Sequence, residues 1–335
     1  MKTNESSISK AASLSVAPMM DWTDRHCRAF HRTLSRCALL YTEMVTAPAL
    51  VRGGARHLLD HDPGEHPLAL QLGGSDPAEL AEAARMGAGA GYDEINLNVG
   101  CPSDRVQSGT FGAVLMRRPE LVAECCAAMI AAQPREVTVK CRLGVDDQRV
   151  AETLPAFLDT VRRAGVSRFV IHARPAWLQG LSPKQNRTVP PLDYGLVRDM
   201  KAAFPDLHVS LNGGVADLDD VAAHLSTGLD GVMVGRAAYH DPAAILLDAD
   251  RRIFGGPNPA RSRAEAARAM VPHAARHVAG GGRVHQVTRH MLGLFAGCPG
   301  ARRWRQVLSE GAARPDAGAE LIEEALGQVE RAAAA

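Results

Sequence analysis

The stretch INLNVGCPS, residues 95–103, decides how the rest of the chain is interpreted. Apolar residues occupy every second position from Ile95 to Val99, which predicts a short strand. The strand must end before Pro102, because proline has no N–H to donate to a sheet and Gly100 favours a turn. Cys101 is therefore expected at the end of a strand.

Polar residues in the same stretch indicate a pocket. Asn96 and Asn98 alternate with the apolar residues, whereas strands of parallel sheets are usually apolar on both faces. The carboxyl ends of such strands carry the chemistry of α/β barrels, so Cys101 is a candidate catalytic group. The alternative is a small buried residue without a chemical role, as many free cysteines are.

The same alternation of an apolar run, a turn and a helical pattern repeats along the chain. The apolar runs cover residues 14–19, 39–44, 68–72, 94–99, 137–142, 168–172, 208–211 and 231–234. Eight such units match a closed (β/α)₈ TIM barrel, since open doubly wound sheets usually have five or six strands. We expect this α/β barrel to occupy residues 1–254, with residues 1–12 as a frayed end.

The pattern changes after Phe254, where GGPNP (255–259) is typical of a linker. Helical patterns then cover residues 263–279, 284–294, 300–309 and 317–331. We therefore expect a small all-helical domain over residues 260–335.

Charge is distributed unevenly although the net charge is only +1. Residues 251–335 contain 13 arginines and no lysine against 7 acidic residues, whereas residues 1–250 carry 25 basic and 30 acidic side chains. Arginine suits phosphate binding and base stacking, so the end of the chain is interpreted as an anion-binding module. The alternative is an ordinary solvated helical surface.

Other sequence features bear on the compartment. The chain has no run near the roughly 20 apolar residues that a membrane span needs, and its first ten residues are polar. Its seven cysteines lack the spacing of a disulfide framework or a zinc site. We expect a cytoplasmic protein with no metal site and no membrane contact.

Several further strand ends carry side chains that suit a flat heteroaromatic ligand. These are Pro18, Met19 and Met20 at the end of the first strand, Gln71 in the third, Lys140 in the fifth and His172 in the sixth. Methionine is a soft contact surface, an amide both donates and accepts hydrogen bonds, and a lysine in a barrel needs a partner. Any one of these methionines or the histidine could instead be part of the core.

Glycines follow the last two strands. Asn212, Gly213 and Gly214 end the seventh, and Gly235 and Arg236 end the eighth. Barrels commonly bind a phosphate there, since glycine lets a phosphate approach the backbone. The chain has no GxGxxG, so a flavin mononucleotide, FMN, fits better than a dinucleotide.

A thiol facing a reduced flavin suggests a definite reaction. Hydride passes to one carbon of an activated C=C bond while an acid protonates the other. A thiol is mostly protonated at neutral pH, so Cys101 can be that acid.

At these residues the chain resembles the tRNA-dihydrouridine synthases. The stretches that carry the resemblance are APMMD (17–21), QLGG (71–74), INLNVGCPSDRVQSGTFGAVLM (95–116), KCRLGVDD (140–147), IHAR (171–174), NGG (212–214) and MVGRAAY (233–239). Two more, WLQGLSPKQNRTVPPLDY (177–194) and HMLGLFAGCPGARRWRQ (290–306), look like the bacterial dihydrouridine synthase A branch. The likeness covers about residues 14–312.

The resemblance implies an activity and a set of site residues. It implies FMN as cofactor, NADPH as reductant, hydride transfer to C6 and a proton from Cys101 to C5 of uridines 20 and 20a in the tRNA D loop. The implied FMN contacts are Pro18, Met19, Met20, Gln71, Lys140, His172, Asn212, Gly213, Gly214, Gly235 and Arg236. The implied tRNA contacts are Asn98, Lys184, Arg187, Arg302 and Arg303. We expect a monomer without a protein partner.

The residues between Arg174 and Leu192 form a connection too long for an ordinary βα loop, and long loops are usually functional. With Trp177, Lys184 and Arg187 it is expected to face RNA. Three other hypotheses stay open: a flavin barrel acting on a free pyrimidine or enone, a Schiff-base enzyme using Lys140 on a phosphosugar, and an RNA-binding scaffold without catalysis.

Overall fold

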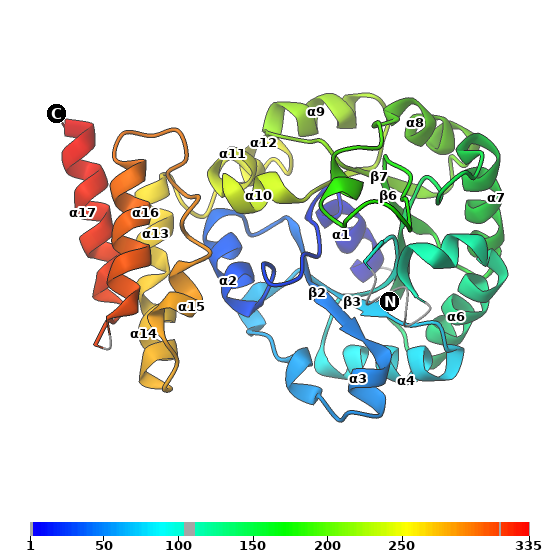
Figure 1. Ribbon diagram of the computed structural model, residues 1–335, viewed down its shortest axis with the longest axis horizontal. Helices are drawn as coiled ribbons and strands as arrows, with labels where there is room; N and C mark the ends of the chain where they lie inside the picture. The colour runs from blue at the N-terminus through cyan, green and yellow to red at the C-terminus, as the bar shows by residue number, and fades with distance from the viewer. Residues whose placement is uncertain (1–2, 104–110, 315, 335) are drawn as a thin grey trace.

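The computed structural model describes residues 3–103, 111–314 and 316–334 (Figure 1). Eight parallel strands close into a barrel in chain order, as predicted. They are β1 Leu14–Val16, β2 Leu39–Thr46, β3 Leu68–Gly73, β4 Glu94–Val99, β5 Glu136–Arg142, β6 Arg168–His172, β7 His208–Asn212 and β8 Gly231–Val234. The pairing of β1 with β8, from Leu14 opposite Val232 to Val16 opposite Val234, completes the ring.

The first strand is shorter than predicted. It ends at Val16 rather than at Met19, although the N–H of Ala17 still donates to the carbonyl of Val234 at 2.8 Å. Pro18 then has no N–H with which to continue the ladder. The residues from Pro18 onward are thereby released from the sheet and bend over the end of the barrel.

Helices cover the outside of the barrel. They are α2 Arg25–Leu34, α3 Ala47–Val51, α4 Pro77–Ala90, α6 Pro119–Ala132, α7 Val150–Arg163, α8 Tyr194–Ala203, α9 Leu218–Ser226, α10 Arg236–His240, α11 Pro242–Leu246 and α12 Ala249–Arg252. Short 3₁₀ turns lie at η1 Arg56–Leu59, η2 Pro63–Glu65, η3 Gly112–Arg117 and η4 Gln185–Arg187. Aspartates cap several helices, as Asp193 does by accepting the N–H of Leu196 at 2.9 Å.

From Thr3 onward the N-terminal segment is not frayed, contrary to the expectation. Thr3–Ala11 form helix α1. Ala11 and Ala12 are buried in an apolar cluster with Leu39 and Tyr41 of β2. A Cβ on Gly231 would lie 2.2 Å from the carbonyl oxygen of Ala12, so only glycine allows this close approach. Burial against the barrel therefore orders a segment whose own sequence is polar.

The end of the chain is helical, with different boundaries from those expected. The helices are α13 Arg263–Ala269, α14 Val271–Ala279, α15 Val284–Thr288, α16 Ala301–Glu310 and α17 Glu320–Ala334, with the 3₁₀ turn η5 Gly311–Ala313. The first predicted helix divides at Met270, because Pro272 cannot donate to the helical ladder. Figure 1 shows these helices beside the barrel, next to α2.

The predicted helix over residues 284–294 is wrong beyond Thr288. The carbonyl of Met291 accepts the N–H of Leu294 at 3.0 Å, three residues on as in a tight turn, and also the indole N–H of the buried Trp304 at 2.9 Å. A Cβ on Gly293 would lie 2.3 Å from the carbonyl oxygen of His240. The segment therefore turns and packs its backbone directly against the end of α10.

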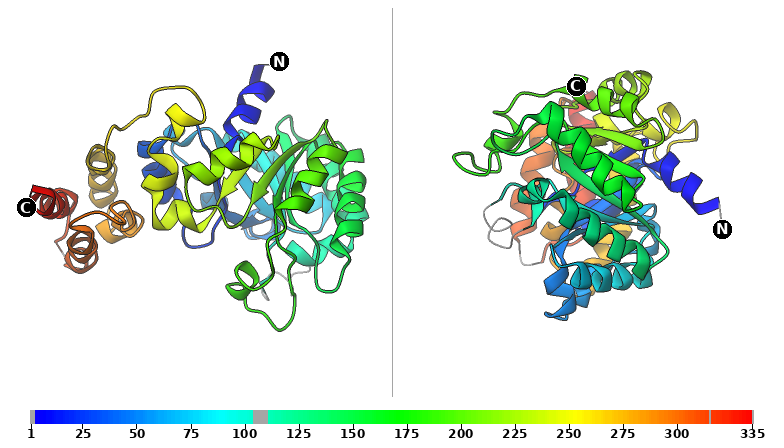
Figure 2. Two further views of the ribbon diagram at one scale, coloured as in Figure 1. Left: turned by 90° about the horizontal axis from the view of Figure 1, so that it is seen from above. Right: turned by 90° about the vertical axis from the view of Figure 1, so that its right-hand side faces the viewer.

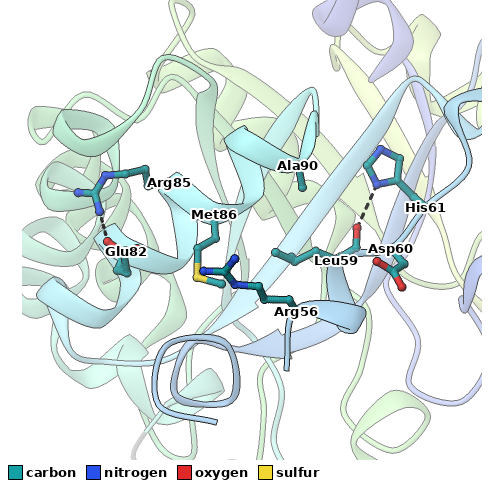
Figure 3. Close-up of a pocket in the computed structure, with 8 residues that line it drawn as sticks. All are labelled: Arg56, Leu59, Asp60, His61, Glu82, Arg85, Met86 and Ala90. Atoms are coloured by element: carbon teal, nitrogen blue, oxygen red, sulfur yellow. Dashed lines mark hydrogen bonds and ion pairs between the residues drawn. The ribbon is translucent and has the colours of Figure 1, made fainter. Parts of the chain in front are cut away.

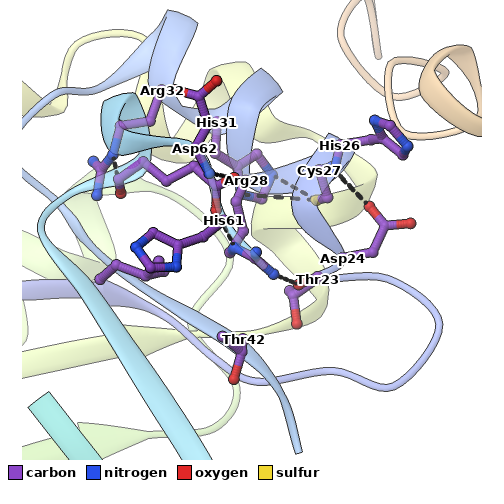
Figure 4. A network of polar contacts seen from close by, with 12 residues as sticks. Thr23, Asp24, His26, Cys27, Arg28, His31, Arg32, Thr42, His61 and Asp62 are labelled. Carbon is purple, nitrogen blue, oxygen red and sulfur yellow. Dashed lines mark hydrogen bonds and ion pairs between the residues drawn. The ribbon is translucent and has the colours of Figure 1, made fainter. Parts of the chain in front are cut away.

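Asp24 joins the barrel to the C-terminal helices. It caps α2 by accepting the N–H groups of His26 and Cys27, as Figure 4 shows at the start of that helix. Its other oxygen accepts from Arg289 at 2.6 Å and from His290 at 3.0 Å. Burial opposes ionisation of Asp24, but these bonds and charges outweigh it and hold its pKa well below the usual range.

Every helix that the structure describes is too short or too polar to cross a lipid bilayer. The connection between β6 and α8, residues 174–192, is called the mouth loop below. Figure 2 shows it projecting from the end of the barrel opposite α1. This is the end at which the strands finish.

Candidate active site

A cavity of about 680 Å³ opens at the carboxyl ends of the strands. All the residues predicted to bind FMN line it, and so do Cys101, Asn98 and Arg187. These residues come from the ends of seven strands, all but β2, and from the mouth loop. They converge because the carboxyl ends of parallel strands in a closed barrel share one rim.

Asn98 holds the turn that carries Cys101. Its Oδ1 accepts the N–H groups of Gly100 and Cys101, each at 3.0 Å, and its Nδ2 donates to Oε1 of Gln71 at 2.8 Å. Gln71 in turn donates to Asn96 at 2.8 Å. The amide of Asn98 is thus engaged at both ends and only 8% exposed, a placement that favours support of the turn over contact with RNA.

Cys101 lies at the edge of this cavity, half-buried. Its carbonyl accepts the N–H of Ala113 at 2.9 Å, and its Sγ lies 3.5 Å from Oγ of Ser103. The turn is therefore held by backbone contacts on both sides of the thiol. This leaves the side chain in place at the cavity wall, with no shorter hydrogen bond from Sγ to the part of the chain that the structure describes.

The cavity wall beside the Cys101 turn is cationic, since Lys140 lies opposite Asn98 in the pairing of β4 with β5. Nζ of Lys140 donates to Oδ1 of Asn212 at 3.1 Å, and Asn212 donates to the carbonyl of Met233 at 2.8 Å. Burial and the charge of Arg142 lower the pKa of Lys140 to about 8. Burial and the charges of Arg142 and Lys140 also hold the pKa of His172 well below its usual value. His172 is therefore neutral at physiological pH.

The glycines after β7 form a tight turn that no larger residue fits. Gly213 and Gly214 have φ angles of 112° and 79°, which favour glycine. A Cβ on Gly213 would lie 2.8 Å from Cδ2 of His172, and one on Gly214 would lie 2.2 Å from the hydroxyl of Tyr194. That hydroxyl donates to the carbonyl of Gly213 at 2.9 Å. The turn thus exposes backbone to the cavity.

Arg236 stands beside this turn and links it to the mouth loop. It follows Gly235 at the end of β8, is exposed, and donates from Nη2 to the carbonyl of Arg187 at 3.3 Å. Arg236, Arg187 and the glycine turn thus line the same cavity, an arrangement that suits an anion such as phosphate.

Three predicted RNA contacts lie away from the cavity. Lys184 is exposed on the mouth loop but does not line the cavity. Arg302 and Arg303 are exposed on α16, where Arg303 donates to Gln306 at 2.9 Å. The structure therefore provides two surfaces separate from the cavity wall.

Several arginines at the end of the chain pair with carboxylates, and one of these carboxylates, Asp24, lies outside residues 251–335 and so lowers the counted excess. Arg268 pairs with Glu330 at 2.7 Å, Arg314 with Glu324 at 3.2 Å, and Arg289 with Asp24. Each of these arginines is partly neutralised by a contact between segments that are distant in the sequence. The arginines of α16 are not in carboxylate pairs among the described residues.

The sequence interpretation missed Arg142 as part of the site. It lines the cavity and is only 2% exposed. The signal was present, because Arg142 is two residues from Lys140 and side chains at alternate positions of a strand face the same side.

A second cavity, of about 540 Å³, lies between η1 and α4 (Figure 3). It is lined by residues of both charges, such as Arg56, Asp60 and the pair of Glu82 with Arg85. It shares no residue with the strand ends and has no side chain suited to redox chemistry.

The chain was compared with known proteins. Residues 15–330 match the profile of the dihydrouridine synthase (Dus) family. A tRNA-dihydrouridine(20/20a) synthase of Vibrio cholerae is 53% identical over 317 residues, which are 94% of this chain and 96% of the relative. One of Xanthomonas campestris is 57% identical over 312 residues, 93% of this chain and 92% of the relative.

Among solved structures, the old yellow enzyme homologue from Zymomonas mobilis is similar with a TM-score of 0.52. It is 13% identical, and the alignment covers 73% of this chain and 89% of that chain. At this level of identity the likeness concerns the barrel fold alone.

Proposed function

Because this chain belongs to the dihydrouridine synthase family, we propose that it reduces the C5=C6 bond of uridines 20 and 20a in the D loop of tRNA. The observation that carries the proposal is Cys101, on a turn that Asn98 holds at the edge of the cavity, with the cation of Lys140 on the neighbouring strand. Positions 20 and 20a are taken from the names of the relatives in Vibrio cholerae and Xanthomonas campestris. Because the chain belongs to this family, it no longer supports the hypotheses of an RNA-binding scaffold without catalysis and of a Schiff-base enzyme.

The residues of the cavity fit FMN. The glycine turn after β7 lies where added Cβ atoms would clash, and with Gly235 and Arg236 it suits the phosphate. The ring system would contact Pro18, Met19, Met20, Gln71, Lys140, His172 and Asn212. When bound, reduced FMN supplies the hydride for C6 of uracil, and NADPH supplies the electrons that reduce it.

The protein's own residues manage the proton and the orientation of the substrate. The thiol of Cys101 donates a proton to C5, while Asn98 keeps the turn in place through the N–H groups of residues 100 and 101. Lys140, with its pKa near 8, is cationic at neutral pH and can stabilise negative charge beside it. Neutral His172 can form hydrogen bonds without adding charge.

The remaining parts of the proposal concern tRNA. Residues 1–254 form the catalytic domain and residues 260–335 the tRNA-binding domain. Contacts to tRNA come from the exposed Lys184, Arg187, Arg302 and Arg303, since exposed arginines and lysines bind phosphates, while Asn98 supports the Cys101 turn. The enzyme acts as a cytoplasmic monomer.

The test begins with the purified protein. A flavin absorbance band at about 450 nm, with FMN released on denaturation, is the expected result. NADPH oxidation should depend on tRNA that lacks dihydrouridine, and the product should carry dihydrouridine at positions 20 and 20a. Reduction of free uracil or uridine as fast as tRNA would favour the free-pyrimidine hypothesis, and a protein without flavin would refute the proposal.

A further inference from the structure

Arg142, at the carboxyl end of β5, bonds to two separate loops of the cavity. Its Nε donates to the carbonyl of Gly100 at 2.9 Å. Its Nη1 donates to the carbonyls of Pro175 at 3.1 Å and Asn186 at 2.9 Å, both in the mouth loop. Arg142 therefore connects the turn that bears Cys101 to the mouth loop.

The burial of this cation needs a reason. Arg142 is 2% exposed, and no carboxylate among the described residues pairs with it. A buried charge without an opposite charge is unfavourable unless its hydrogen bonds are satisfied. Guanidinium has several N–H donors in a rigid plane, so it can bond to three carbonyls of two loops at once, which a lysine ammonium on its single flexible stem cannot match.

The bonded carbonyls belong to residues that organise each loop. Gly100 directly precedes Cys101, and the N–H of Gly100 donates to Oδ1 of Asn98. Asn186 is fully buried and bonds through its side chain to both the N–H and the carbonyl of Trp177, at 2.7 and 2.8 Å. Arg142 thus bonds to the residue around which the mouth loop folds.

We propose that Arg142 is a positioning residue that holds the Cys101 turn and the mouth loop in one fixed arrangement. The inference rests on the proposed function, because it takes Cys101 as the proton donor and the mouth loop as facing RNA. Its consequence is that the thiol and Arg187, which follows Asn186 and lines the cavity, are placed by the same side chain.

The test uses Arg142→Lys, which keeps the charge, and Arg142→Ala, which leaves room for added guanidinium. Arg149→Ala is the matched control, because Arg149 is on the surface with its side chain 82% exposed. Dihydrouridine formation is measured in a single turnover at saturating tRNA with reduced enzyme. In the same samples, trypsin cleavage after Lys184 and Arg187 reports how firmly the mouth loop is held, independently of catalysis.

Both Arg142 variants are expected to slow the single turnover by roughly 10- to 100-fold, as a misplacement of about 1 Å can. They should also be cleaved faster in the mouth loop, while the control behaves as the parent. Millimolar guanidinium should restore the alanine variant and not the lysine variant. Parental turnover and cleavage in Arg142→Lys would overturn the inference, as would slow turnover with an unchanged mouth loop.

Failure of the proposed function gives a different pattern. If the parent protein itself forms no dihydrouridine, the proposed function is wrong. The cleavage rates of the parent and the two variants still decide whether Arg142 holds the mouth loop. If Arg142→Ala does not fold, Arg142→Lys alone decides the outcome.

Discussion

Replacing Cys101 with alanine should abolish dihydrouridine formation while leaving the fold and the flavin in place. The turn is held by backbone bonds from Asn98 and Ala113, and an alanine keeps all of them. Among the described residues, the thiol makes one long contact, 3.5 Å to Oγ of Ser103. The loss of stability should therefore be small, about 1 kcal/mol or less.

The loss of activity should be much larger. Removing a general acid costs about 10²- to 10⁴-fold in rate, which corresponds to roughly 3–5 kcal/mol of activation free energy. The rate of NADPH-dependent flavin reduction should stay within about twofold of the parent, because that step needs no proton from Cys101. The assay is rapid-mixing absorbance for flavin reduction, followed by single-turnover dihydrouridine formation on unmodified tRNA.

Cys125→Ala and Cys126→Ala are the matched controls. Both cysteines are fully buried in α6, far from the strand ends in the chain and outside the cavity lining. These changes should cost about 1–2 kcal/mol of stability with little effect on turnover. Cys101→Ala is thus expected to lose activity with little loss of stability, and the control variants to lose stability with little loss of activity. A Cys101→Ala enzyme that forms dihydrouridine at the parental rate would refute the role of the thiol.

Three further predictions concern charge. Lys140→Met should stabilise the flavin-free protein at pH 7, because burial disfavours the lysine cation and lowers its pKa to about 8. The stability advantage of the variant should shrink as pH rises from 8 towards 10.5, because Lys140 loses its proton in the folded parent before it does in the unfolded chain. The free energy of unfolding of both proteins is measured in urea at pH 7 and pH 10. An equal advantage at the two pH values would contradict the prediction. Asp24→Asn should destabilise the protein by about 1–2 kcal/mol at pH 7, because it weakens the hydrogen bonds from Arg289 and His290. The low pKa of the Asp24 carboxyl stabilises the folded protein above about pH 4, and this stabilisation is lost as pH falls further. The difference in melting temperature between parent and variant should therefore narrow in acid. Equal melting curves at pH 7 would contradict the prediction. Changing Arg302 and Arg303 together to Ala should flatten the salt dependence of tRNA binding by about one to two units of log K per log salt and leave flavin content unchanged. An unchanged slope at four salt concentrations would assign these arginines to the solvated surface.

The sequence by itself determined the barrel and most of its rim. Period-two apolar runs and the turns that end them are local properties, so the run before Cys101 predicted β4 from Glu94 to Val99 without knowledge of its neighbours. A closed parallel barrel then brings all carboxyl strand ends to one rim, and for this reason residues as distant as Met19 and Arg236 could be assigned to one cavity.

Only the tertiary structure decided what depends on contacts between distant segments. The polar N-terminus is helical because the barrel buries Ala11 and Ala12, and the turn at Gly293 exists because it packs on α10. The arginine excess is reduced because Arg252 and Arg289 pair with Asp219 and Asp24, which lie in residues 1–250. Arg142 holds two loops that are more than 70 residues apart in the chain, Gly100 and Pro175. Burial and pairing arise from the whole fold, and no local pattern of residues records them.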